Sequence, residues 1–236
     1  MIRILGPVDI LLPSGEVEIE SRQAGAVLGA LVLSLNRAVS VDHLALIVWG
    51  ESPPTTAVNT LQSQVSRLRH TLGSDVIRYD DRSYELQARP EQVDAVLFEQ
   101  LVTAAMDAGD ADSRRALCQE GLSLWRGLPF GELSEQEPFR WESLRLEELR
   151  LSCIELRLEA DLDLGHHGLV VGTVEGLVEE YPYRENLWFM LVDALGRSGR
   201  RVEALRACER LRGMLRDIGL EPTAAIRGLE DQILAG

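Results

Sequence analysis

The sequence predicts a mainly α-helical protein in two parts, a small α+β part over residues 1–90 and an all-α part over residues 91–236. Two observations predict this division. Short strand patterns bounded by turn residues flank three helical patterns in the first part, whereas the second part shows only helical patterns. In addition, Gly165 and Gly199 lie 34 residues apart, which is the period of a repeat built from paired helices.

The first 90 residues predict strands, then three helices, then a hairpin. Three short strands fit residues 2–5, 8–12 and 16–20, because turn residues such as Gly6-Pro7 separate them. Helices fit residues 21–36, 40–50 and 55–73, and a hairpin fits residues 76–87. This order is that of a winged helix-turn-helix.

The helix predicted over residues 55–73 is the most informative segment. Thr55 or Thr56 can cap its start and Gly73 can end it. One face is apolar and carries Val58, Leu61, Val65, Leu68 and Leu72. The opposite face has no acidic residue and carries Thr56, Asn59, Thr60, Ser63, Arg67 and His70. Such side chains suit a DNA major groove, although an ordinary solvated amphipathic helix is the alternative.

The expected DNA contacts combine this polar face with flanking residues, the first helix and the wing. They are Arg22, Thr56, Asn59, Thr60, Ser63, Gln64, Arg67, Arg69, His70, Arg78 and Arg82. Arg69 flanks the apolar stripe, where its stem can pack while its guanidinium reaches sideways.

The charge of the chain limits where DNA can bind. The net charge is −14, so the protein as a whole is a poor general binder of nucleic acid. Residues 1–90 hold 8 arginines and 10 acidic residues, whereas residues 91–236 hold 16 arginines and 28 acidic residues. We therefore expect DNA contact to be confined to a local patch in the first part, with a protein-binding or oligomerising role for the acidic second part.

Several short motifs resemble the Streptomyces antibiotic regulatory proteins. In the first part they are Val39-Ser-Val-Asp-His-Leu, Val48-Trp-Gly-Glu, Asn59-Thr-Leu-Gln and Val65-Ser-Arg-Leu-Arg. In the second part, which resembles the bacterial transcriptional activation domain, they are Val93-Asp-Ala-Val-Leu-Phe-Glu, Leu122-Ser-Leu-Trp-Arg-Gly, Arg145-Leu-Glu-Glu-Leu-Arg, residues 155–165 and Ser198-Gly-Arg-Arg-Val-Glu-Ala-Leu. The resemblance implies a transcriptional activator that binds direct repeats in double-stranded DNA near a promoter and contacts RNA polymerase and its sigma factor.

The chain departs from the family pattern at three places. The first helix begins Ser21-Arg22-Gln23 and lacks one basic residue of the family motif, and His70 stands where the family prefers arginine. The wing tip carries Asp80 and Asp81, whose charges repel phosphate. Two alternatives therefore stay open. One is an interaction module whose winged helix no longer binds DNA, and the other is the N-terminal fragment of a larger signalling ATPase.

The second part predicts stacked helical hairpins. Aligning Gly165 with Gly199 also aligns Ile154 with Trp188 and Leu177 with Leu211. We expect seven to nine helices after residue 90, presenting a groove to a peptide or packing against a second copy in a homodimer. A plain helical bundle is the alternative.

The sequence supports no catalytic, cofactor or metal site. The chain has no lysine, so it cannot form a phosphate-binding Gly-x-x-x-x-Gly-Lys loop. Its three cysteines, Cys118, Cys153 and Cys208, are isolated in helical patterns, which favours a reducing cytoplasm. No apolar run is long enough to span a membrane. We therefore expect a cytoplasmic regulator that is not an enzyme.

Overall fold

The computed structural model describes residues 1–19 and 21–235 and divides the chain into two compact units. The first unit contains residues 1–103 and 120–151, and the second contains residues 104–119 and 152–236. This division differs from the predicted boundary between residues 90 and 91, because the beginning of the all-α part packs with the first 90 residues. Three helices, α4 (Asp94–Asp107), α5 (Ala111–Ser123) and α6 (Phe139–Asp163), contribute residues to both units.

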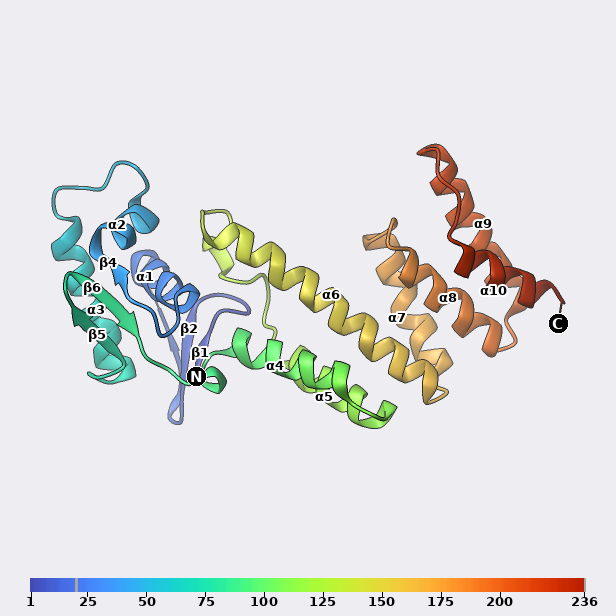
Figure 1. The fold of residues 1–236 in the computed structure, drawn as a ribbon, viewed down its shortest axis with the longest axis horizontal. Helices are drawn as coiled ribbons and strands as arrows, with labels where there is room; N and C mark the ends of the chain where they lie inside the picture. The colour runs from blue at the N-terminus through green and yellow to red at the C-terminus, as the bar shows by residue number, and fades with distance from the viewer. Residues whose placement is uncertain (20, 236) are drawn as a thin grey trace. The chain divides into compact units, whose positions relative to one another are not determined.

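The first unit begins with a three-stranded antiparallel sheet of order β1-β2-β3 (Figure 1). Its strands are β1 (Ile2–Arg3), β2 (Asp9–Leu12) and β3 (Gly15–Glu18). Ile2 and Ile10 face each other across β1 and β2, and both are buried. Strand β1 also forms a parallel bridge to Val93, which brings the start of the all-α part to the edge of this sheet. The third predicted strand ended at Glu20, which lies outside the described residues.

Three helices follow and form the helix-turn-helix core. They are α1 (Arg22–Leu33), α2 (Val41–Trp49) and α3 (Ala57–Leu72). The Ser21 and Ser40 hydroxyls accept hydrogen bonds from the backbone amides of Ala24 and His43, so both serines cap a helix as their residue types favour. Thr56 stands at the N-cap of α3, but its side chain makes no capping hydrogen bond.

The wing is a three-stranded antiparallel sheet of order β4-β6-β5. Its strands are β4 (Val39–Ser40), β5 (Ile77–Asp80) and β6 (Ser83–Leu86). Asp81 and Arg82 connect β5 to β6 with φ angles of 41° and 55°. Two consecutive residues in the left-handed region form the tight hairpin turn that matches the twist of paired strands. The tip of the wing is therefore the pair Asp81 and Arg82, and Asp80 belongs to the strand.

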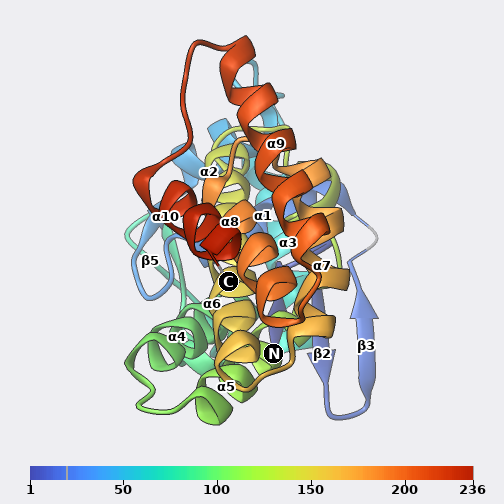
Figure 2. The ribbon, with the colours of Figure 1, turned by 90° about the vertical axis from the view of Figure 1, so that its right-hand side faces the viewer.

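Helices α7 to α10 belong to the second unit and pack in sequence order. They are α7 (His167–Glu180), α8 (Glu185–Arg197), α9 (Arg201–Asp217) and α10 (Ala224–Ala235). Helix α7 packs on α8 and α8 on α9, while α10 lies against both α8 and α9 (Figure 2). Gly165 follows α6 and Gly199 follows α8, with φ angles of 79° and 73°. Because both turns need the left-handed conformation that glycine tolerates, the 34-residue spacing marks equivalent turns of a helical repeat.

The helix count after residue 90 agrees with the sequence. The described residues form seven α-helices there, α4 to α10, together with two short 3-10 helices, Pro90–Gln92 and Gly131–Leu133. Among the described residues, none of these helices is both long and apolar enough to cross a membrane.

Candidate DNA-binding surface

Helix α3 presents a polar face, but that face is rotated relative to the sequence prediction. The buried residues of α3 are Ala57, Leu61, Gln64, Val65 and Leu68. Val58, which was expected in the buried stripe, is 41% exposed, and Leu72 is half-buried. The exposed face of α3 comprises Val58, Asn59, Gln62, Ser63, Ser66, Arg67 and His70. None of these side chains is acidic.

Gln64 is the clearest departure from the expected DNA contacts. Its side chain is only 7% exposed, and its Oε1 atom has no hydrogen-bond partner among the described residues. It lines a hollow of about 380 Å³ that also contacts Ile10 and Val17 of the first sheet. Gln64 therefore belongs to the face of α3 that packs inward, and it cannot contact DNA while the helix is packed this way.

Arg69 also has a structural partner. It is half-buried, and its Nε atom donates to the backbone carbonyl of Ile77 at 2.8 Å. Because Ile77 begins strand β5, this bond joins the last turn of α3 to the wing. The Arg69 guanidinium is therefore engaged in a hydrogen bond that positions the wing.

Gln62 and Ser66 are exposed residues that the prediction missed. With about 100° of rotation per residue, both lie on the same side of α3 as Asn59 and His70. The prediction centred the buried stripe too near Val58, because it did not assign the polar Gln64 to the core. Leu61, Gln64 and Leu68 follow the i, i+3, i+7 spacing of one buried helix face. That spacing is the signal that could have placed Gln62 and Ser66 on the exposed face.

The other predicted residues of α3 remain on or beside this face. Thr56, Asn59, Ser63 and His70 are exposed, and Thr60 is half-buried. Arg67 is exposed but lies at one edge, where it lines the same hollow as Gln64 and Glu18. The centre of the exposed face is thus made of amide and hydroxyl side chains with His70, and Arg67 flanks it.

The wing adds exposed side chains beside the last turn of α3. Arg78 and Tyr79 are exposed on β5, and the Tyr79 ring packs on the Tyr84 ring with centroids 4.9 Å apart. Arg82, at the tip, pairs with Asp42 at the start of α2, with 3.4 Å between Nη2 and Oδ1. Both side chains are largely exposed, so this ion pair is weak and leaves Arg82 free to exchange partners.

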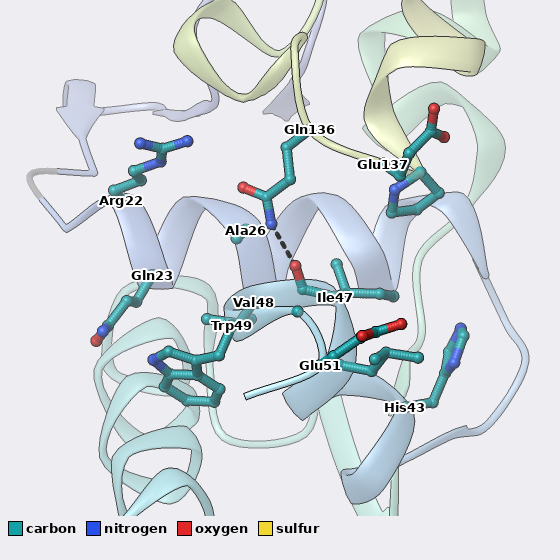
Figure 3. A pocket seen from close by; sticks show the side chains of 13 residues that line it. Arg22, Gln23, Ala26, His43, Ile47, Val48, Trp49, Glu51, Gln136 and Glu137 are labelled. Atoms are coloured by element: carbon teal, nitrogen blue, oxygen red, sulfur yellow. Dashed lines mark hydrogen bonds between the residues drawn. The ribbon is translucent and has the colours of Figure 1, made fainter. Parts of the chain in front are cut away.

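Arg22 lies in a different setting from the other predicted residues. It is the exposed first residue of α1 and lines a hollow of about 800 Å³ with the end of α2 and residues 136–138 (Figure 3). Trp49 and Leu46 form part of the apolar wall, and the Gln136 side chain donates to the Ile47 carbonyl. The hollow does not include any residue of α3 or the wing.

A buried carboxylate and a backbone hydrogen bond fix the start of the all-α part to the segment that follows β1. The Asp94 carboxylate, which is fully buried, accepts hydrogen bonds from the backbone amides of Ile4 at 2.8 Å and Leu5 at 3.0 Å. Burial raises the pKa of Asp94, and these hydrogen bonds oppose the rise. The Arg126 backbone amide donates to the Leu5 carbonyl at 2.8 Å.

The Arg126 side chain completes this network. Its Nη1 atom lies 2.6 Å from Asp9 Oδ2, and its Nη2 atom lies 3.6 Å from Asp94 Oδ2. Asp9 also pairs with Arg3, whose pKa is raised by the hydrogen bond to Asp9. The motifs at residues 93–99 and 122–127 therefore supply the contacts that join the winged helix to α4 and to the segment after α5.

The described residues contain no group of three or more His, Cys, Asp or Glu side chains arranged to hold a metal ion. The first unit presents a helix with a polar, non-acidic face and a wing attached to its last turn. The second unit, described by itself, contains stacked helical hairpins. This combination defines a winged-helix transcription regulator with an attached helical-repeat domain.

Comparisons with known proteins agree with that class. The family model described as "Bacterial transcriptional activator domain" matches residues 93–234. The regulatory protein DnrI of Streptomyces peucetius is 33% identical, over 99% of this chain and 91% of that protein. The regulatory protein AfsR of Streptomyces griseus is also 33% identical, but this chain spans only 24% of it. The chain belongs to the Streptomyces antibiotic regulatory protein family and is a transcriptional regulator.

A solved structure shows the same fold. Mycobacterium tuberculosis EmbR, in complex with a low affinity phosphopeptide, superposes with a TM-score of 0.90 at 30% identity. The match covers 99% of this chain and 64% of the EmbR chain. The predicted winged helix followed by a helical-repeat domain is thereby confirmed.

Proposed function

We propose that this protein is a sequence-specific DNA-binding activator that reads bases with the exposed face of α3. One observation supports this most strongly. In a chain of net charge −14, the seven exposed side chains of α3 include no carboxylate and carry amides, hydroxyls, an arginine and a histidine. An acidic protein can approach DNA only through such a patch, since any carboxylate there would repel phosphate.

The residue types suggest which side chains of the exposed face contact bases and which contact phosphates. Asn59 and Gln62 can each form two hydrogen bonds with an adenine edge, which is the specific pairing open to side-chain amides. Ser63 and Ser66 can reach bases or phosphates, and Arg67 at the edge can reach guanine or the backbone. Arg78 and Tyr79 are exposed on the wing, and side chains of these types can contact the sugar-phosphate backbone.

The second part of the proposal concerns partners. We infer that the protein binds direct repeats near a promoter, with a second copy on the neighbouring repeat, and contacts RNA polymerase and its sigma factor through the helical domain. Family membership and the activator-domain match at residues 93–234 support this assignment. A cytoplasmic, non-enzymatic regulator of a secondary-metabolite gene cluster is the role that fits.

The test is a titration of the full-length protein against the DNA upstream of the neighbouring operon, at several salt concentrations. The proposal expects a specific site whose affinity falls as salt rises, together with much weaker binding to scrambled DNA. Equal and weak binding to both DNAs at low salt would reject it.

A second candidate function is an interaction module that does not bind DNA. The exposed carboxylates of Asp80 and Asp81 favour it, since both stand on the hairpin of the wing. The same titration separates the two functions, because a module without DNA binding gives no salt-dependent specific complex.

A further inference from the structure

Two buried cysteines meet in the second unit. Cys118 lies on α5 and Cys153 on α6, and neither side chain has any exposed surface. The Cys153 Sγ atom lies 3.8 Å from the Cys118 carbonyl oxygen, to which its thiol donates, and the two thiol groups are close enough to shift each other's pKa. The Cys153 sulfur of α6 therefore already contacts the backbone of Cys118 on α5 in the reduced protein.

An arginine stands one helical turn from each cysteine. Arg114 precedes Cys118 by four residues on α5, and Arg157 follows Cys153 by four residues on α6. Each has a buried Nε atom without a hydrogen-bond partner among the described residues. Two cations whose donors are not fully used therefore lie near the thiol pair along α5 and α6.

These surroundings distinguish the two sulfurs. The neighbouring Cys153 thiol lowers the pKa of Cys118, and the charges of Arg157 and Arg114 lower it further, while burial opposes them. The same contact raises the pKa of Cys153, as does its burial. A thiol with a lowered pKa beside one with a raised pKa is the arrangement of a reactive cysteine and its resolving partner.

We propose that Cys118 and Cys153 are an oxidation site that forms a reversible disulfide between α5 and α6. With hydrogen peroxide, the Cys118 thiolate attacks one oxygen, the O–O bond breaks, and sulfenic acid and hydroxide form. The Cys153 sulfur then attacks the sulfenic sulfur, the S–S bond forms, and the sulfenic oxygen leaves as water with the thiol proton. The two thiols lose two electrons in all, one peroxide is reduced, and a dithiol reductant reverses the reaction.

Cys208 provides an internal control. It is also buried, at 1% exposed, but burial raises its pKa to about 11, and the carboxylate of Glu230 adds to the rise. Among the described residues, no other cysteine influences the pKa of its thiol. If burial alone decided how readily a thiol is oxidised, all three cysteines would react with peroxide to the same extent.

The experiment treats the reduced full-length protein with hydrogen peroxide, then unfolds it in an alkylating agent and maps its peptides by mass spectrometry. The expected product is a peptide pair linked through Cys118 and Cys153, with Cys208 alkylated. Because burial slows the native reaction, a second sample is refolded from denaturant in a glutathione redox buffer, where access does not limit exchange. The same linkage should dominate there.

Variants separate a specific pair from general thiol oxidation. Cys208→Ala should give the same linked peptide in wild-type yield, whereas Cys118→Ala and Cys153→Ala should give none. Arg114→Gln combined with Arg157→Gln should slow the peroxide reaction several-fold and leave the linkage formed in glutathione intact. The proposal is overturned if Cys118 and Cys153 are recovered as thiols from the glutathione buffer, or if the three cysteines pair at random.

Discussion

Arg126 and Asp9 form an ion pair across 117 residues of sequence, with 2.6 Å between Nη1 and Oδ2. Asp9 lies in the first sheet, and Arg126 follows α5, so the pair joins the winged helix to the beginning of the activator domain. The guanidinium also donates to the Pro7 carbonyl. The first compact unit therefore depends on contacts that the predicted boundary at residue 90 would cut.

The first prediction tests this ion pair. Arg126→Ala leaves the Asp9 and Asp94 carboxylates, both nearly buried, without this cation, so the free energy of unfolding should fall by about 2–4 kcal/mol. Chemical denaturation of the full-length protein measures it. Arg89→Ala is the matched control, because its pair with Glu91 is largely exposed and should contribute little. Equal losses in both variants would mean that the network does not hold the unit together.

The second prediction uses two glycines of α1. A Cβ atom at Gly29 would lie 2.8 Å from Phe139 Cε1, whereas one at Gly25 would meet nothing closer than Leu133 Cδ1 at 3.6 Å. Gly29→Ala should therefore lower the free energy of unfolding by about 1–3 kcal/mol, since the overlap forces Phe139 to move. Gly25→Ala should be neutral or raise it by up to about 1 kcal/mol, because alanine favours the helix. Thermal unfolding of both variants checks this, and a stable Gly29→Ala would show that α1 does not pack on Phe139.

The third prediction concerns a fragment of residues 91–236. It retains α7 to α10 but loses the partners of Phe130 and Phe139, which are buried in the first unit. We expect helical circular dichroism together with rapid proteolysis within residues 120–151. A fragment as resistant to protease as the full-length chain would show that the activator domain folds independently of the winged helix.

The fourth prediction concerns the wing. Replacing Asp80 and Asp81 with Asn keeps their size and turn preference while removing two negative charges from the hairpin. If the wing lies along DNA, binding to all sequences should tighten by about two- to fivefold per charge at low salt and less at high salt. Binding titrations at two salt concentrations measure this. Unchanged affinity at low salt would place the wing away from DNA and favour the interaction module.

Local patterns in the sequence were enough to predict the three strands of the first sheet, the three helices and the hairpin of the wing, but not the short strand β4. Alternation and turn residues located the strands, helical spacing located α1 to α3, and Gly165 and Gly199 located equivalent turns of the repeat. The packing of residues 94–103 and 120–151 with the first unit was not predictable in this way. Bonds such as that from Ile4 to Asp94 join residues 90 apart, and neither residue carries a local signal of its partner.

The candidate site was predictable only in part. The residues of α3 predicted an amphipathic helix with a polar face. Which residues form that face depended on which polar residue is buried. Gln64 packs inward and Val58 faces out, which apolar spacing alone does not indicate. Arg69 was expected at DNA, but its bond to Ile77 depends on a strand eight residues later in the chain.

A specificity ratio measures whether the exposed face of α3 reads DNA sequence. The ratio compares the affinities of the full-length protein for its upstream site and for scrambled DNA of equal length. In the double variant Asn59→Ala/Gln62→Ala, loss of two amide contacts should lower this ratio by about 30-fold or more, at about 1–3 kcal/mol per contact. Affinity for scrambled DNA should stay nearly the same. The control Gln119→Ala, an exposed residue of the second unit, should keep the wild-type ratio. A double variant that keeps the wild-type ratio, or that loses both affinities equally, would show that the exposed face of α3 does not read DNA sequence.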